Sequence, residues 1–197
     1  EGGDEPEMLY RNLVSLCRKD RLLELVHDFV AFDGGIKKVC RHNQFFGVKA
    51  SQDFVRRQAS GIIWHTQGSG KSLTMVWLAK WIRENVDNSR VLIITDRTEL
   101  DKQIEDVFLG VSESIVRTKS GRELIAEMNS AENTLICSLV HKFGHTVHAE
   151  DQDVRSYLDE LRRALPKNFE AKGNIFVFVD ECHRTQSGVL HSAMKEI

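Results

Sequence analysis

One segment of this 197-residue chain limits its possible folds more than any other, namely residues 61–72, which read GIIWHTQGSGKS. The segment begins with a mostly apolar run of strand type, continues through a glycine-bearing loop, and reaches Lys71, where a run with helical periodicity opens. Gly68 and Gly70 allow the loop backbone to turn its N–H groups toward an anion, and the helix N-terminus adds partial positive charge. A strand, such a loop and a helix in this order are typical of phosphate-binding loops in α/β proteins.

The same segment predicts which side chains contact the phosphates. Lys71 has the position from which an ammonium group reaches the β and γ oxygens, and the Ser72 hydroxyl is predicted to ligate Mg²⁺. His65 departs from the pattern G-x-x-x-x-G-K-[ST], because it stands at the position of the first glycine. A chance glycine turn before a helix is the competing interpretation, and the order of the elements argues against it. The predicted nucleotide-binding residues of this loop are Thr66, Gln67, Gly68, Ser69, Gly70, Lys71 and Ser72.

A pair of carboxylates near the end of the chain complements this loop. Asp180 and Glu181 directly follow the apolar run of residues 175–179, and α/β proteins place their ligands at this carboxyl edge of the strands. Asp180 is predicted to hold Mg²⁺, mostly through water, and Glu181 to orient or deprotonate the water that attacks the γ-phosphate. The competing interpretation is a solvated strand end. Lys71 and Glu181 are therefore the predicted catalytic residues.

Alternating strand-type and helical runs predict the fold class. Uninterrupted apolar strands separated by helices favour a mostly parallel sheet with both faces covered, which is a three-layer α/β fold. Apolar residues cover most of the circumference of the helix that begins at Lys71, so this helix is predicted to be central. Ser120 and Glu123 have the spacing of a capping box and predict another helix start. The predicted strands are Gly61–His65, Val91–Thr95, Thr134–Ser138 and Ile175–Val179.

The first 43 residues are predicted to form a tail and a short helical segment ahead of the lobe of residues 44–197. Apolar residues recur at helical spacing from Leu9 to Phe32, which predicts one broken helix or two short ones. Gly34 and Gly35 are predicted to end them. A polar segment then leads into a further helix near Val48–Arg57.

Composition leaves the function open but narrows the setting. Lys and Arg number 27 against 29 Asp and Glu, giving a net charge of −2, so bulk charge demands no nucleic acid partner. No apolar stretch approaches the roughly 18 residues that span a bilayer, and the N-terminus lacks the pattern of a signal peptide. The 4 cysteines lie too far apart for a disulfide scaffold and are expected to be reduced. We therefore expect a cytoplasmic protein with no membrane partner.

Several segments resemble a known family. HTQGSGKS, VLIITDRTELDKQI and FVFVDECHRTQSG resemble motifs I, Ia and II of superfamily 2 helicases. More narrowly, DGGIKKVCRHNQFFGVKA followed by GIIWHTQGSGKSLTMVWLAKWI resembles the motor (restriction) subunit of type I restriction-modification enzymes, whose P-loop also carries a histidine. The resemblance implies a RecA-like lobe that binds ATP and Mg²⁺ and grips double-stranded DNA. The partners that it implies are the modification and specificity subunits of the restriction complex.

The resemblance also assigns roles to residues outside the P-loop. By position Gln44 resembles the glutamine that reads adenine, for which a carboxamide offers both a donor and an acceptor, and a surface helix cap is the competing interpretation. His183 resembles the histidine that couples the ATP site to the DNA side. Residues at strand ends match DNA-contacting segments and are expected to touch phosphates, although such loop tips are often merely solvated. These expected DNA-binding residues are Thr95, Arg97, Ser138 and Lys142.

The implied activity is that of an ATP-dependent type I site-specific deoxyribonuclease, whose motor translocates double-stranded DNA before cleavage. Such a subunit also has a nuclease domain and a second RecA-like lobe with an arginine finger, and neither fits within 197 residues. We therefore expect these residues alone to be inactive. Two alternatives stay open: a nucleotide- or partner-binding module without turnover, and another superfamily 2 DNA helicase or type III restriction motor.

Overall fold

The computed structural model describes residues 5–66, 68–95, 105–111, 113–130, 134–139, 159, 162–166, 169 and 172–180. Its helices and strands follow one another in the order α1 (Glu5–Cys17), α2 (Lys19–Asp28), β1 (Val30–Asp33), β2 (Ile36–Val39), α3 (His42–Arg56), α4 (Lys71–Asn85), β3 (Ser89–Thr95), β4 (Val116–Thr118), α6 (Gly121–Asn129), β5 (Leu135–Leu139) and β6 (Asn174–Val179). No helix in these described ranges has both the length and the hydropathy of a membrane-spanning segment.

A parallel sheet lies at the centre of the fold, with the strand order β4-β5-β3-β6. Every residue of β3 is buried, as expected for an inner strand covered on both faces. Its odd-numbered residues Val91 and Ile93 belong to one apolar cluster, and its even-numbered residues Leu92 and Ile94 belong to another. The period of two along a strand thus gives the sheet two separate cores.

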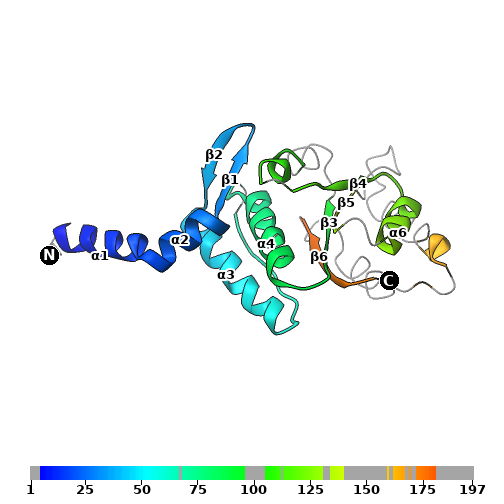
Figure 1. The fold of residues 1–197 in the computed structure, drawn as a ribbon, viewed down its shortest axis with the longest axis horizontal. Coiled ribbons are helices and arrows are strands. Elements are labelled where there is room, and N and C mark those ends of the chain that lie inside the picture. Colours follow the sequence, from blue (N-terminus) through cyan, green and yellow to red (C-terminus); the bar gives the residue numbers. More distant parts are fainter. Residues whose placement is uncertain are drawn as a thin grey trace.

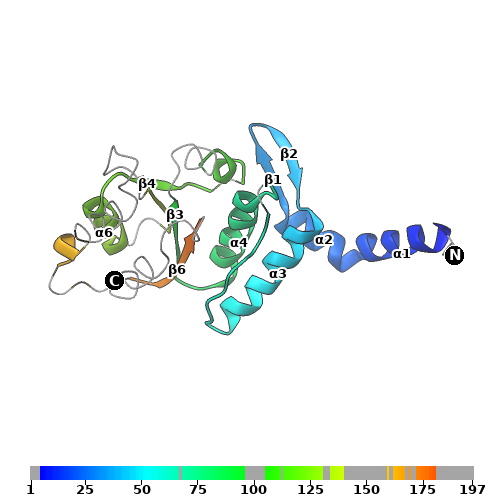
Figure 2. The ribbon, with the colours of Figure 1, turned by 180° about the vertical axis from the view of Figure 1, so that it is seen from behind.

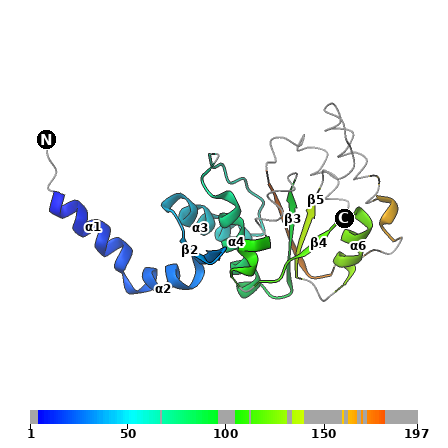
Figure 3. The same ribbon diagram turned by 90° about the horizontal axis from the view of Figure 1, so that it is seen from above.

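Helices cover both faces of this sheet, so the predicted three-layer α/β fold is confirmed. The sheet lies between α4 and α6 (Figure 1), and the view from above shows the same order (Figure 3). Viewed from behind, α3 lies beside α4 on the side away from the sheet (Figure 2). Because α4 is enclosed by the sheet and by α3, it buries residues around most of its circumference, including Val76, Trp77 and Ile82, as predicted.

The direction of α4 places its first turn at the edge where a ligand is expected. α4 ends at Asn85 and β3 begins at Ser89, so the short connection makes the helix run back antiparallel to the strand on which it packs. The N-terminus of α4 therefore lies at the level of the carboxyl ends of β3 and β6 (Figure 1). Parallel α/β sheets bind their ligands at this edge.

The N-terminal region differs from its prediction in one respect. The broken helix is confirmed as α1 and α2, but it ends at Asp28, and the prediction that helix continues to Phe32 is wrong. Residues 30–39 instead form the antiparallel hairpin of β1 and β2, and its turn contains Gly34 and Gly35 with φ values of 56° and 82°. Adjacent residues with positive φ are typical of the tight turns that connect hairpin strands.

Burial explains why this hairpin forms. Phe29, directly before β1, and Ala31 in β1 are fully buried in the core that α4 shares with the sheet, so the start of the hairpin is attached to the lobe. The polar segment that follows is shorter than predicted, because α3 already begins at His42. The predicted boundary between residues 43 and 44 thus falls in the first turn of α3, and the domain division stays a prediction.

The prediction of a strand at Gly61–His65 is wrong, because this segment belongs to neither sheet of the described residues. Residues 59–66 form no regular secondary structure and pack along α3 instead. A Cβ on Gly61 would lie 3.1 Å from the ring of Phe54, and one on Gly47 would lie 3.3 Å from the ring of His65. Ile62 and Trp64 are 78% and 86% exposed. A strand is defined by its partner, and the apolar pattern alone does not identify one.

The other predicted elements can be compared directly. β3, β5 and β6 match the predicted strands, whereas the short β4 was not predicted. The helix start predicted at Ser120 is confirmed at α6, where the Glu123 N–H donates to the Ser120 hydroxyl over 3.2 Å. The Glu123 carboxylate accepts the N–H of Lys119 over 2.6 Å, one residue before the position that a capping box requires. The described cysteines, Cys17, Cys40 and Cys137, form no disulfide bond with one another.

We predict that Arg90 supports this fold through the end of α6. Arg90 is 6% exposed, and its guanidinium donates to the carbonyl of Glu127 over 2.6 Å and to that of Met128. Burial lowers the pKa of Arg90, but arginine keeps its charge at neutral pH. Arg90→Leu removes a donor from the Met128 carbonyl and another from the Glu127 carbonyl, which also accepts the Ser130 N–H, so we expect the free energy of unfolding to fall by about 2 kcal/mol in urea denaturation.

Arg117→Leu is the matched control for this prediction. Arg117 also carries an ion pair, with Glu105 at 3.1 Å, but both side chains are about one-third exposed. Exposed pairs contribute at most about 1 kcal/mol, so this variant should lose clearly less stability. Equal losses in the two variants would contradict the special role of Arg90.

Candidate nucleotide-binding site

The predicted phosphate-binding loop has the backbone conformation that its glycines allow. Gly68 and Gly70 have φ values of 75° and 82°, in the left-handed region that other residues rarely adopt. The Ser69 N–H donates to the Thr66 carbonyl over 3.2 Å and closes a tight turn. Gly70 is the N-cap of α4, so Lys71 and Ser72 occupy its first turn, where unsatisfied N–H groups attract anions.

One of the predicted nucleotide-binding residues, Ser69, has a side chain that fits a phosphate ligand. Ser69 is 9% exposed, and its hydroxyl is buried with no hydrogen-bond partner among the described residues. A buried hydroxyl normally finds a partner, and phosphate oxygens would accept its hydrogen bond. Lys71 and Ser72 are partly buried, and Gln67 lies outside the described residues. The donors of this loop therefore fit ATP.

The carbonyl of Gly70 is a meeting point of the loop with two helices. It accepts the backbone N–H of Thr74 over 3.2 Å and the Thr74 hydroxyl over 3.3 Å, which starts α4. It also accepts Nε2 of Gln44 over 2.9 Å, which connects the loop to α3. This carbonyl therefore determines how the loop enters the helix.

Gln44 lies beside the loop, as its predicted role in reading adenine requires. Its carboxamide, however, is hydrogen-bonded to other residues of the chain. Gln44 is 2% exposed, and its Oε1 accepts the backbone N–H of Arg41 over 2.7 Å. Its other end donates to Gly70, so a donor and an acceptor suited to adenine are both in use. Reading of adenine by Gln44 stays a prediction, because these bonds use one of the two N–H donors and one of the two lone pairs of the carboxamide. The competing interpretation, a helix cap on the surface, is wrong in one respect: Gln44 does cap α3, but it is buried.

Two further residues, Arg41 at the N-cap of α3 and Gly47 within α3, lie next to the loop segment. Arg41 Nη1 donates to the Gly68 carbonyl over 3.4 Å. The ring of His65, the residue that replaces the first glycine of the pattern, lies against Gly47, where a Cβ would come within 3.3 Å of it. Its Nδ1 is buried without a partner in the described part of the chain. The absence of a side chain at Gly47 thus makes room for the histidine.

The carboxylate side of the site is described only in part. Asp180 follows β6, is 8% exposed, and donates its N–H to the carbonyl of Ile94 in β3 over 3.0 Å. Its position at the carboxyl end of a strand beside β3 agrees with the predicted metal site at this edge. Glu181 and His183 lie outside the described residues, so their predicted roles stay predictions.

Two of the four predicted DNA contacts lie within the described residues. Thr95 ends β3, Ser138 lies in the neighbouring β5, and each is 1% exposed. Such burial weighs against direct phosphate contact by these two hydroxyls. The other two predicted DNA-binding residues, Arg97 and Lys142, are charged and lie outside the described residues. The predicted DNA contact now depends on them.

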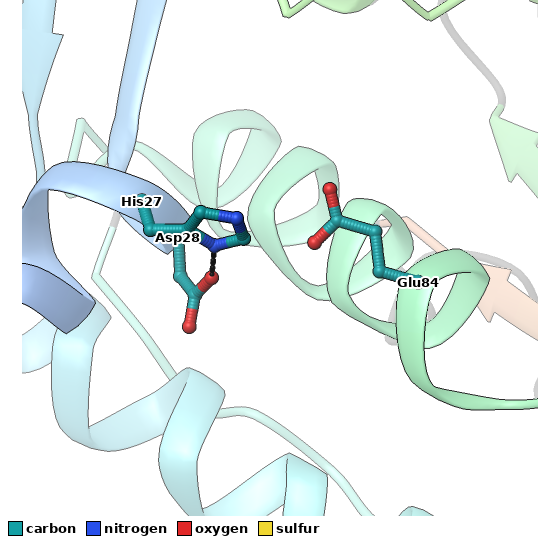
Figure 4. Close-up of side chains that lie close together, drawn as sticks. All are labelled: His27, Asp28 and Glu84. Atoms are coloured by element: carbon teal, nitrogen blue, oxygen red, sulfur yellow. Dashed lines mark hydrogen bonds and ion pairs between the residues drawn. The ribbon is translucent and has the colours of Figure 1, made fainter.

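A separate cluster of possible metal ligands lies away from this loop. One ligand atom each of His27, Asp28 and Glu84 lies within 4.8 Å of the others (Figure 4). His27 Nδ1 already pairs with Asp28 over 2.5 Å, and the Lys80 ammonium lies 3.6 Å from Glu84. Glu84 is in the last turn of α4, about 20 Å along the helix from the phosphate-binding loop. This cluster therefore does not provide the metal of the nucleotide site.

Comparison with known proteins agrees with this geometry. Residues 43–197 match the SWI2/SNF2 ATPase family. The chain is similar to a Methanocaldococcus jannaschii protein assigned as the endonuclease subunit of the type I restriction enzyme MjaIXP, with 29% identity over 93% of the chain and 17% of that relative. It is also similar to the HindI endonuclease subunit of Haemophilus influenzae, with 28% identity over 89% of the chain and 17% of the relative.

A third relative is the SauMSSORF170P endonuclease subunit of Staphylococcus aureus, with 28% identity over 79% of the chain and 16% of the relative. The family resemblance predicted from the motifs is thereby confirmed. The chain spans less than a fifth of the length of these relatives.

We predict that the two left-handed glycines of the loop differ in their tolerance of alanine. A Cβ on Gly70 would overlap Gln44 Nε2, whereas one on Gly68 would meet nothing within 4 Å. Both substitutions strain the backbone by about 1–2 kcal/mol, but only Gly70→Ala also displaces Gln44. We expect Gly70→Ala to weaken the binding of Mg²⁺-ATP more, as measured by titration calorimetry, and equal effects would contradict the close approach of α3.

Proposed function

Because the chain belongs to the SWI2/SNF2 ATPase family, we propose that it is the ATP-binding motor lobe of the endonuclease subunit of a type I restriction enzyme. In this proposal ATP hydrolysis drives translocation of double-stranded DNA before cleavage, in a cytoplasmic complex with modification and specificity subunits. The single observation that carries the proposal is the phosphate-binding loop at the N-terminus of α4, with its left-handed glycines and the unpartnered Ser69 hydroxyl. The similar relatives support the choice of enzyme class.

The residues at the edge of the sheet have complementary roles in the proposed hydrolysis. Lys71 binds the β and γ oxygens and reduces the charge repulsion at the γ-phosphate. Ser72 and Asp180 are the proposed metal ligands, and Mg²⁺ would neutralise charge that develops on the phosphate oxygens. Glu181 takes the proton of the attacking water or holds that water in line. The described residues among these, Lys71, Ser72 and Asp180, lie on elements that meet at the carboxyl edge of the parallel sheet.

DNA contact is proposed for the same edge, through Arg97 and Lys142. Cations that touch phosphates position a motor on a duplex without reading its sequence, which suits a protein that moves along DNA of any sequence. Recognition of a specific site would then be left to the specificity subunit. A binding module without turnover and another superfamily 2 motor are the alternatives that the experiments below separate.

We predict that Lys71→Ala and Glu181→Gln both abolish ATP turnover by the complete polypeptide but differ in binding. Lys71→Ala removes a charge that contacts ground-state phosphates, so ATP affinity falls as well. Glu181→Gln keeps the shape of the site and should still bind Mg²⁺-ATP. The measurements are phosphate release in the presence of DNA and equilibrium binding of ATP.

Lys80→Ala is the matched control for Lys71→Ala, because Lys80 lies on the same helix but bonds to the His27 carbonyl over 2.7 Å, away from the loop. It should retain turnover. Intact turnover in Lys71→Ala would rule out the proposed nucleotide site, and a wild type that binds ATP without turnover would favour the binding module.

We further predict that Arg97→Ala weakens binding of the complete polypeptide to unrelated duplexes by a similar factor. Loss of one phosphate contact should reduce the slope of log K against log salt concentration by about one unit. The test measures the binding of two unrelated duplexes across a salt series. An unchanged slope would make Arg97 a solvated loop residue, and a loss confined to one duplex would make it a base reader.

A further inference from the structure

His65 attaches the segment before the phosphate-binding loop to the rest of the lobe. Residues 59–66 have no regular secondary structure, and all of them except His65 are exposed. The His65 ring lies against Gly47 in α3, and its Nδ1 is buried without a partner among the described residues. A segment that belongs to neither sheet depends on other contacts for its position. The ring of His65 is the contact of this kind that lies next to the loop.

Gly47 makes this contact possible. A Cβ at residue 47 would lie 3.3 Å from Cε1 of the His65 ring, which is closer than an ordinary van der Waals contact. Residue 47 lies inside α3, where glycine is less favourable than alanine because its backbone loses more freedom on folding. A glycine at this place therefore destabilises the helix locally, and the packing of His65 offsets that loss.

The turn of the loop begins at the residue that follows this contact. Thr66 is next to His65 in the chain, and its carbonyl accepts the Ser69 N–H over 3.2 Å. Ser69 is buried, and its hydroxyl has no partner among the described residues. Because consecutive Cα atoms keep a fixed separation of about 3.8 Å, a displacement of His65 also displaces Thr66 and the turn. The position of the ring thus determines where the turn that presents Ser69 begins.

We propose that His65 is a positioning residue, whose ring packs against Gly47 and fixes the start of the phosphate-binding loop relative to α3. In this role the packed ring restricts a position at which a glycine would leave the backbone free. The inference rests on the proposed function, because it assumes that the loop binds the phosphates of a nucleotide. It predicts that a change in either partner weakens the binding of any polyphosphate.

His65→Gly and Gly47→Ala disturb the contact from its two sides. The first restores the glycine of the phosphate-loop pattern and removes the ring, and the second displaces the ring. The probes are Mg²⁺-ATP and inorganic tripolyphosphate with Mg²⁺, each titrated calorimetrically into the complete polypeptide. We expect each variant to lower both affinities by the same factor, about tenfold, because the start of the loop must then be ordered on binding.

The double variant tests the contact itself. Without the ring, a Cβ at residue 47 would meet nothing closer than Cγ2 of Ile63, at 3.9 Å. Adding Gly47→Ala to His65→Gly should therefore leave both affinities unchanged and raise the thermal midpoint, because alanine favours the helix. In the wild-type background the same substitution should lower the affinities. The first comparison holds even if Gly47→Ala alone does not fold, because both of its members lack the ring.

Gly61→Ala is the matched control, because it crowds the same segment against the same helix at a place farther from the loop in the chain. Its Cβ would lie 3.1 Å from the ring of Phe54 in α3. It should lower the thermal midpoint and leave the tripolyphosphate affinity unchanged. Equal losses of affinity in Gly61→Ala and Gly47→Ala would show that any crowding of the segment has this effect, and would overturn the inference.

Three further outcomes overturn it, and they are distinguishable. Weakening of ATP alone, with tripolyphosphate unchanged, would place the effect of His65 at the base and not at the loop. Unchanged affinities in both single variants, or equal effects of Gly47→Ala with and without the ring, would remove the positioning role and leave the proposed function intact. A wild type that binds neither probe would remove the proposed function and this inference with it.

Discussion

Burial of β3 on both faces is the constraint from which the rest of the structure follows. A strand that is covered on both sides needs helices in both flanking layers, and α4 and α6 supply them through two separate apolar clusters. Because α4 connects to β3 through three residues, it runs antiparallel to the strand on which it packs. That direction brings the predicted phosphate-binding loop to the carboxyl edge of the sheet, where Asp180 follows β6.

Sequence patterns predicted the parts of the fold in which local pattern and burial agree. The apolar runs at 91–95, 134–138 and 175–179 form a parallel sheet, and the helix at Lys71 is central, because inner strands and an enclosed helix need unbroken apolar sequence. The hairpin of residues 30–39 was missed, since Phe29 and Ala31 fit helical spacing as well as a strand. The prediction of a strand at residues 61–65 was wrong, because this apolar segment pairs with no other strand in the described ranges.

The candidate site was predictable to the extent that it is local. The loop from Thr66 to Ser72 is contiguous, so its spacing specifies both the glycine conformations and the helix start. The contacts of Gln44 and Arg41 with the loop join residues 26 and 27 positions apart, and no spacing rule encodes them. Gly47 is the one sequence feature that points to this contact, because a glycine in α3 leaves the space that the ring of His65 occupies.

Two buried glutamines on one helix show that burial alone does not reveal what a polar side chain does. Gln44 and Gln52 are 2% and 1% exposed, yet only Gln44 is bonded to the loop, whereas both amide atoms of Gln52 lack partners among the described residues. A buried amide contributes little net stability even when it is paired, and an apolar side chain of the same shape can do as well. The bonds of Gln44 connect the start of α3 with the start of α4, and they add to the bonds by which the Thr74 N–H and hydroxyl already direct the Gly70 carbonyl along α4.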